Sequence, residues 1–321
     1  RRLQELIQRR LAAKEQIILF LNKRGYAGFV SCRMCGHVLK CPHCDISLTE
    51  HKNGKMVCHY CGYEQPRVTR CPVCGSKYIS GFRAGTQQIE EAVKKMYPQA
   101  RVLRMDMDTT AGKEGHEKIL AAFSAQEADI LVGTQMIVKG HDFPNVTLVG
   151  VLAADMSLYA GDYRAAERTF ELLTQAAGRA GRGKRAGEVV IQTYTPQHYS
   201  IAAAAAQNYE QFYEEEIAFR SIMDYPPVCN MLMVTLSSKN EEQLLAACTF
   251  LKEVIPEWKK EQVRITGPVA AGVYKRNDYY NQVVYLKATA YEKLTACKDR
   301  LEMLCRENTL FRSIGLQFDF N

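Results

Sequence analysis

The sequence predicts an α/β protein, in which a parallel sheet is interrupted by a cysteine-rich insertion and followed by an α+β domain. Apolar strands alternate with amphipathic helices on both sides of residues 31–76, which indicates one sheet around an insertion. That insertion holds eight of the twelve cysteines. Residues 228–320 then read strand, helix, strand, strand, helix, strand, which predicts a split βαββαβ unit.

Length and composition set the class of protein. A chain of 321 residues with 47% apolar content has room for two or three domains with real cores. It contains no apolar run of about 20 residues and no secretory signal pattern, so we expect neither a membrane protein nor a secreted one. Residues 1–80 hold 14 Lys and Arg against 5 Asp and Glu, a local basic excess that suits a nucleic-acid backbone.

The predicted sheet begins near the N-terminus. Apolar residues at helical spacing predict a helix over residues 3–14, which leads into an apolar strand over residues 16–21. Lys23 and Arg24 follow that strand, either as a nucleic-acid contact or as a solvated basic turn. Beyond the insertion we expect a helix over residues 85–97 capped by Thr86, a strand over 100–105 and a helix over 113–124.

The insertion contains four C-x2-C knuckles within a stretch of 43 residues. Two thiolates at this spacing can bind one tetrahedral ion, so four knuckles predict two structural Zn²⁺ sites of four thiolates each. A disulfide framework is the alternative, but the Gly and Pro around the knuckles are typical of sharp metal-binding turns. The predicted ligands are Cys32, Cys35, Cys41, Cys44, Cys58, Cys61, Cys71 and Cys74.

The spacing between knuckles predicts how they pair. Only five residues separate Cys35 from Cys41, whereas thirteen separate Cys44 from Cys58, a usual zinc-ribbon length. We therefore expect a nested arrangement, in which the second and third knuckles form one site and the first and fourth form the other. Because eight thiolates already suffice for two ions, we expect the nearby histidines to be free of metal; these are His37, His43, His51 and His59.

Residues 130–155 read as an apolar strand, a polar loop and a second apolar strand. The loop places Thr134, Gln135, Lys139 and Asp142 at the predicted carboxyl end of the sheet, where ligands bind in open α/β sheets. Farther along, Arg179 and Arg182 are three residues apart among small residues, so both can reach one anion, for which a polyphosphate is the obvious candidate. The alternatives are a polar linker and an ordinary Gly-rich basic loop.

The C-terminal part begins with a predicted connector helix over residues 200–223 and continues into the βαββαβ unit, which we interpret as ferredoxin-like. Residues 267–282 are predicted to form one loop that carries Lys275 and Arg276 among tyrosines. Aromatic and basic side chains together suit unpaired bases and phosphates, yet the loop could equally meet a protein or be ordinary surface. Cys229, Cys248, Cys297 and Cys305 lack knuckle spacing and are predicted to be core residues.

Several of these segments together resemble a known family. Residues 130–155 and QAAGRAGR at 175–182 are similar to motifs V and VI of superfamily 2 helicases. IILFLNKRGY at 17–26, the eight cysteines, GTQMIVKGHDFPNVTLV and RAAERTFELLTQAAGRAGR resemble the PriA family of primosomal replication-restart helicases. The resemblance implies a RecA-like helicase lobe 2 at 1–30 and 77–199, a zinc insertion at 31–76, and a C-terminal domain at 200–321.

The resemblance also implies residue roles. Gln175, Arg179 and Arg182 would contact the γ-phosphate of ATP bound to another lobe, and Asp142 and Gly140 would lie near the nucleotide. The DNA contacts implied or expected are Lys23, Arg24, Thr134, Gln135, Lys139, Lys275 and Arg276. The family implies branched DNA forks, single-stranded DNA, single-stranded DNA-binding protein, and primosome and helicase-loading proteins as partners, in the bacterial cytoplasm and at the nucleoid.

The sequence departs from the family in one respect: it has no G-x4-G-K-[ST] phosphate loop and no Asp-Glu pair ending a strand. We therefore expect the C-terminal part of an ATP-dependent 3′–5′ DNA helicase, which uses ATP and Mg²⁺ as a complete protein but does not hydrolyse ATP as this chain alone. The alternative is a zinc-ribbon scaffold that binds nucleic acid or protein without a motor.

Overall fold

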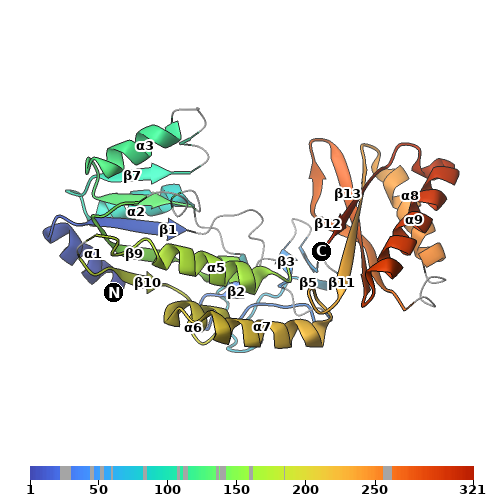
Figure 1. Cartoon of the computed structure of the whole chain (residues 1–321), viewed down its shortest axis with the longest axis horizontal. Coiled ribbons are helices and arrows are strands. Elements are labelled where there is room, and N and C mark those ends of the chain that lie inside the picture. Colours follow the sequence, from blue (N-terminus) through green and yellow to red (C-terminus); the bar gives the residue numbers. More distant parts are fainter. Residues whose placement is uncertain are drawn as a thin grey trace. The chain divides into compact units, whose positions relative to one another are not determined.

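The computed structural model divides the chain into two compact units (Figure 1). The first comprises Arg1–Ala27, Phe82–Ala160 and Arg164–Tyr213, and the second Gly28–Gly81, Gly161–Tyr163 and Glu214–Asn321. The structure describes residues 1–21, 30–43, 47–50, 54–58, 61–81, 85–106, 109–110, 115–134, 137, 142–158, 162–183, 185–255 and 262–321.

A five-stranded parallel sheet forms the centre of the first unit. Its strands are ordered β10-β9-β1-β8-β7, and every neighbouring pair is parallel. This confirms the parallel sheet that the alternation of strands and helices predicted. The strands are β1 (Gln16–Leu21), β7 (Val102–Met105), β8 (Ile130–Gly133), β9 (Val146–Leu152) and β10 (Glu188–Ile191).

Both faces of this sheet are covered by helices. All six residues of β1 are buried, and successive side chains point to opposite faces. Ile17 and Leu19 pack with α1 (Arg2–Ala12) and α2 (Thr86–Met96), whereas Ile18 and Phe20 pack with the helices of the other face. Those helices are α3 (Gly115–Ser124), α5 (Ala165–Ala177), α6 (Tyr199–Ala206) and α7 (Tyr209–Met223), and the short α4 (Asp155–Leu158) follows β9.

Two helix predictions were wrong in detail. Gly85, not Thr86, is the N-cap of α2; Thr86 begins the helix, and its hydroxyl donates to the buried carboxylate of Asp106. The helix predicted over residues 200–223 is two helices, because Gln207 adopts a left-handed conformation at φ 52°. Asn208 then accepts a hydrogen bond from the backbone N–H of Gln211 and so caps the start of α7.

The cysteine-rich insertion belongs to the second unit and contains only short strands. β2 (Val30–Cys32) pairs with β6 (Ile79–Gly81), and β3 (Thr49–Glu50), β4 (Lys55–Val57) and β5 (Glu64–Pro66) form a three-stranded antiparallel sheet. Strands of two or three residues bury little apolar surface, so this segment depends on something other than its own core.

The C-terminal part of the second unit is a four-stranded antiparallel sheet ordered β12-β13-β11-β14, with two helices on one face (Figure 1). Its elements follow the predicted order of strands and helices. They are β11 (Asn230–Ser238), α8 (Glu241–Val254), β12 (Arg264–Arg276), β13 (Tyr279–Ala288), α9 (Tyr291–Glu307), the 3-10 turn η3 (Thr309–Phe311) and β14 (Gly315–Phe320).

The opposite face of this sheet packs against the cysteine-rich insertion. Met231 of β11 and Tyr285 of β13 share a hydrophobic cluster with Met56 and Cys58. A side chain at Gly62 would come within 2.8 Å of Val269 on β12, so the two segments approach closely. The insertion and the C-terminal sheet therefore share a core, whereas the sequence led us to attach the insertion to the parallel sheet.

The four cysteines outside the knuckles are buried, as predicted for core residues: Cys229, Cys248, Cys297 and Cys305. Burial raises the pKa of the Cys248 thiol to about 11 and that of Cys305 to about 12. Among the described residues, no helix combines the length and the apolar character needed to cross a bilayer.

Candidate functional site

The segment that joins α5 to β10 carries both predicted phosphate-binding arginines. We call residues 178–187 the arginine loop; all of them except residue 184 are described. Its position is set by α5, which buries Phe170, Leu173 and Ala176 and leaves Gln175 exposed. The helix therefore delivers the loop to the end of the sheet at which β10 begins.

Three glycines make the arginine loop compact. Gly181 has φ 76°, a conformation that L side chains rarely adopt, and its N–H donates to the carbonyl of Val146 at 3.0 Å. A side chain at Gly183 would overlap the carbonyl oxygen of Pro144, and one at Gly187 would overlap Gly181. Since Val146 is the first residue of β9, the loop is pinned to the amino end of that strand.

The charges at this loop favour an anion. Arg182 lies 3.6 Å from the carboxylate of Asp142 and donates from Nε to the carbonyl of Gly178 at 2.7 Å. Arg179 is half-buried, and its burial, together with the charge of Arg182, lowers the pKa of its guanidinium below the ordinary value. The carboxylate of Asp142 offsets part of this effect on Arg179.

The predicted position of Asp142 was wrong. Thr134 directly follows β8 at the carboxyl end of the sheet, as expected, but Asp142 lies near the start of β9 and contacts Arg182. The reason is topological: β8 and β9 are parallel and lie on either side of β1, so the chain between them must return to the opposite end of the sheet. Gln135, Lys139, Gly140, Lys23 and Arg24 lie outside the described residues.

Four thiols of the insertion meet in one cluster. The Sγ atoms of Cys32 and Cys74 are 3.6 Å apart, as are those of Cys35 and Cys71, and all four lie within 4.8 Å of one another. The first and fourth knuckles therefore come together, as the nested arrangement predicted. They share one backbone pattern, in which the cysteine carbonyl accepts from the glycine that follows the knuckle, Gly36 or Gly75, each at positive φ.

A second cluster contains Cys41, Cys58 and Cys61, with 3.5 Å between the sulfurs of Cys41 and Cys61. Its predicted fourth ligand, Cys44, lies outside the described residues. Of the predicted non-ligand histidines, His37 and His43 are described and belong to neither cluster, and His51 and His59 are not described.

The donor sets fit zinc. Thiolates bind Zn²⁺ at about 2.3 Å, which places the sulfurs of a tetrahedral site about 3.8 Å apart. The sulfur–sulfur separations of 3.5 and 3.6 Å in the two clusters are close to that value. Sulfur donors without an open position are typical of structural sites.

The predicted basic loop at residues 267–282 is a β-hairpin instead. β12 and β13 pair up to Lys275–Tyr280 and Arg276–Tyr279, joined by a two-residue turn at Asn277 and Asp278 with φ 49° and 63°. These angles are typical of a type I′ turn, whose twist matches that of paired strands. We did not predict this hairpin from the sequence, although the turn residues Asn277 and Asp278 were a signal for it.

The tip of this hairpin presents basic and aromatic groups together. The ammonium group of Lys275 lies 4.7 Å from the ring centre of Tyr280, and that of Lys239 lies 5.4 Å from the ring centre of Tyr279. Tyr279 is 43% exposed, so part of this aromatic side chain is open to solvent. Such a surface can stack on a base while its cations meet phosphates.

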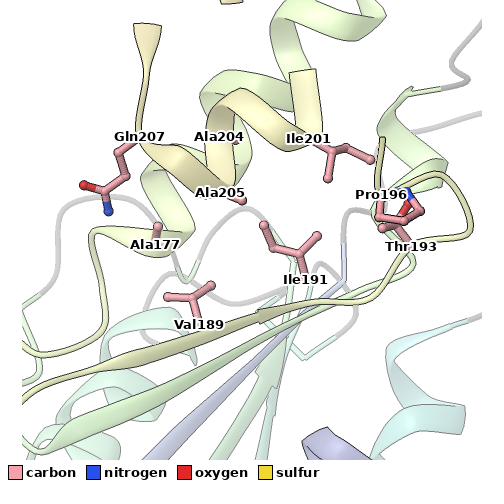
Figure 2. Close-up of a pocket in the computed structure, with 9 residues that line it drawn as sticks. All are labelled: Ala177, Val189, Ile191, Thr193, Pro196, Ile201, Ala204, Ala205 and Gln207. Carbon is pink, nitrogen blue, oxygen red and sulfur yellow. The ribbon is translucent and has the colours of Figure 1, made fainter. Parts of the chain in front are cut away.

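A hollow lies between β10 and α6, apart from the sites described above (Figure 2). It has a volume of about 320 Å³ and is lined by Ala177, Val189, Ile191, Thr193, Pro196, Ile201, Ala204, Ala205 and Gln207. Figure 2 shows Val189 and Ile191 pointing from the strand toward the alanines of the helix. None of the nine lining residues is charged, so this hollow does not suit a phosphate.

Comparison with known families covers the three parts of the chain. The family described as "PriA DNA helicase Cys-rich region (CRR) domain" matches residues 41–66. "Helicase conserved C-terminal domain" matches residues 77–184, and "Primosomal protein N C-terminal domain" matches residues 221–320.

Curated relatives match nearly the whole chain but only part of their own length. The Replication restart protein PriA of Bacillus subtilis (strain 168) is 49% identical over 311 residues, which are 95% of this chain and 38% of that protein. The protein of the same name from Synechocystis sp. is 40% identical over 310 residues, 95% of this chain and 37% of that protein. The chain thus spans well under half the length of these relatives.

Proposed function

Because the chain belongs to the PriA family and matches the C-terminal part of its members, we propose that it is the C-terminal part of an ATP-dependent 3′–5′ DNA helicase. The complete protein would recognise abandoned replication forks and initiate primosome assembly for replication restart. In it, ATP and Mg²⁺ would be bound by another lobe, and this chain would supply the arginines that respond to the nucleotide.

The observation that carries this proposal is the arginine loop. Arg179 and Arg182 are held close together on a compact loop at the end of a parallel sheet, beside Asp142. An arginine that reaches a transferring phosphoryl group stabilises the charge that develops there, an effect worth about 10³ or more in rate. Gln175, exposed on the last turn of α5, and Gly140 would complete the contacts with the nucleotide.

Replacement of Arg179 by Ala in the complete protein tests the proposal. We expect DNA-stimulated ATP hydrolysis to fall by about 10³, while fork binding, measured by fluorescence anisotropy, is retained. Arg101→Ala is a matched control, since Arg101 also precedes a strand of the same sheet but pairs with Asp129 at 2.6 Å, away from the loop. Unchanged hydrolysis in the Arg179 variant would mean that the arginine loop takes no part in the reaction, as expected if this chain is only a zinc-ribbon scaffold.

A second experiment concerns the chain by itself. It has no phosphate-loop motif, so we expect background phosphate release from ATP in the presence of single-stranded DNA. Brisk, DNA-dependent release that disappears in an Arg182→Ala control would contradict the division of the active site between two lobes.

The two thiol clusters would hold two Zn²⁺ ions. The first would bind Cys32, Cys35, Cys71 and Cys74, and the second Cys41, Cys44, Cys58 and Cys61. Zinc bound to thiolates alone supplies cross-links, not reactivity. Mass spectrometry of the native chain should find two zinc ions, and a Cys58→Ser variant should keep one.

DNA would be contacted at two places. In the first unit we propose Thr134, with Lys23, Arg24, Gln135 and Lys139, and in the second Lys275 and Arg276 at the tip of the ferredoxin-like C-terminal domain. Replacement of both Lys275 and Arg276 by alanine should weaken fork binding. It should also reduce the dependence of the binding constant on salt concentration by the amount that corresponds to about two phosphate contacts. Lys293→Ala is the control, because Lys293 lies on α9 and donates to Gln262 rather than to the hairpin. Equal salt dependence of fork binding in the two variants would exclude the hairpin as a DNA contact.

Protein partners would include single-stranded DNA-binding protein and the primosome and helicase-loading proteins of the nucleoid. The insertion exposes three large apolar residues beside the first thiol cluster: Met34 at 67%, Val73 at 66% and Tyr78 at 69%. Exposed apolar groups of this size mark contact surfaces. A Tyr78→Ser variant of the complete protein that still binds the purified partner proteins with full affinity would argue against this surface.

A further inference from the structure

A buried carboxylate lies beside the arginine loop and has no role in the account so far. Glu15 directly precedes β1 and is only 7% exposed. Its Oε2 accepts a hydrogen bond from the hydroxyl of Thr147 at 2.5 Å and one from Arg10 at 3.1 Å. Its Oε1 accepts from Nη1 of Arg185 at 2.9 Å. Three elements thus converge on one carboxylate: helix α1, strand β9 and the arginine loop.

The contact with Arg185 fixes the loop at a second point. The first is the hydrogen bond from the N–H of Gly181 to Val146. Arg182 lies between these two anchors, one residue after the first and three before the second. Because β1 and β9 are neighbours in the sheet, both anchors belong to the same rigid framework.

Electrostatics explains why such an anchor is needed. Burial by itself would raise the pKa of Glu15, but the hydrogen bonds from Thr147 and Arg10 and the charges of Arg10 and Arg185 hold it below the ordinary value. Glu15 is therefore ionised at neutral pH. The charge of Arg182 acts on Arg179, and Asp142, 3.6 Å from Arg182, offsets part of it. The ion pair between Glu15 and Arg185 is a further fixed contact that holds this charged loop in place.

We propose that Glu15 is a positioning residue for the arginine pair, and that it acts through Arg185 to hold the arginine loop in the geometry that meets the nucleotide. This inference rests on the proposed function. Glu15 does not touch the nucleotide. It keeps Arg182 within reach of the transferring phosphoryl group, where a displacement of about 1 Å can cost on the order of 10² in rate.

The sequence gives no hint of this link, since 170 positions separate Glu15 from Arg185. A carboxylate before a strand and an arginine before another are each ordinary features of a protein surface. Only the order of strands in the sheet brings them together.

The test uses the complete protein and its DNA-stimulated ATP hydrolysis. Glu15→Gln keeps the shape of the side chain and removes its charge, and Arg185→Ala removes only the link to the loop. We expect each to lower kcat roughly tenfold or more, with KM for ATP within about twofold, because the ground state depends little on this contact. Arg185→Lys should restore much of the rate, since an ammonium group can still pair with Glu15.

Asp129→Asn is the matched control. Asp129 also precedes a strand of this sheet and pairs with an arginine, but that arginine, Arg101, lies outside the arginine loop. Its kcat should equal that of the unchanged protein. Melting temperatures of all variants separate loss of rate from loss of fold.

A double-variant comparison decides the mechanism. In an Arg182→Ala background, Glu15→Gln should change kcat by less than about twofold, because the arginine that Glu15 positions is already absent. Unchanged kcat in Glu15→Gln, or the same loss with and without Arg182, would overturn the inference. Undiminished hydrolysis in Arg182→Ala itself would instead refute the proposed function on which the inference rests.

Discussion

The arginine loop and the cysteine-rich insertion hold their functional side chains by different means. The loop is packed on a parallel sheet whose strand β1 is wholly buried, and glycine contacts and ion pairs fix its path. The insertion has strands of two or three residues, and its thiols meet in two clusters. The arginine loop depends on burial and hydrogen bonds, whereas the insertion, under the proposed function, would depend on metal.

This difference implies that the two regions respond to different perturbations. Removal of metal should leave the parallel sheet intact, and a steric change in the arginine loop should leave the thiol clusters intact. The insertion also covers one face of the C-terminal sheet through Met231 and Tyr285. Loss of metal should therefore also destabilise the C-terminal sheet, an effect that the order of domains along the chain does not suggest.

The largest effect is expected from removal of zinc. Each structural ion contributes on the order of 10 kcal/mol to a domain with little core of its own. Chelation should remove hydrogen-exchange protection from β2, β6 and the covered face of β11, while β1 and β8 stay protected. Retained protection in the insertion after both ions have left would show that its own core suffices.

A smaller effect is expected from Gly183→Ala in the arginine loop. The added methyl group would overlap the carbonyl oxygen of Pro144, so we expect a loss of about 3 kcal/mol in the free energy of unfolding. Gly272→Ala is the control, because a side chain there meets nothing within 4 Å. Urea titration should separate the two variants, with zinc content unchanged in both; equal stabilities would mean that the loop is loosely packed.

A pH effect is expected in the C-terminal sheet. Since burial raises the pKa of Cys248 and Cys305, their thiols add stability that is complete below the unfolded pKa of about 8.5 and declines as pH rises through the folded values. At pH 8 both should resist alkylation until the chain unfolds, whereas zinc-free knuckle thiols should react at once. Rapid alkylation of Cys248 in the folded protein would contradict its burial.

The smallest effect on stability is expected at the hairpin tip. Lys275 donates to Tyr280 and pairs with Asp278, both at the same hairpin tip, and exposed ion pairs contribute little. Lys275→Ala should change the free energy of unfolding by less than about 0.5 kcal/mol. A larger change in thermal or urea unfolding would mean that the tip stabilises the sheet as well as binding its ligand.

Local signals predicted much of the fold. The strand over 16–21 has its predicted bounds, and the helices α8 and α9 occur in the predicted order between the strands of the C-terminal sheet. The hairpin at β12 and β13 was predicted as one loop over residues 267–282, which include Gly267, Pro268 and Gly272. Those residues lie within a strand whose register shifts, and the turn itself is at Asn277 and Asp278.

The residues of the candidate sites could be grouped correctly from the sequence only where their spacing along the chain determines which of them meet. Knuckle spacing led to the pairing of Cys32 and Cys35 with Cys71 and Cys74, which the structure brings together. Asp142 was assigned to the wrong end of the sheet, and Glu15 was not considered. Both depend on the position of β1 between β8 and β9, which no local pattern encodes.

The most direct test of the central claim, that Arg179 and Arg182 meet a transferring phosphoryl group, is the affinity of the complete protein for a transition-state mimic. ADP with aluminium fluoride should bind the Arg179→Ala variant at least about 100-fold more weakly than the unchanged protein, while a non-hydrolysable ATP analogue binds both within a few-fold. Equal affinity of the two proteins for the mimic would contradict the claim.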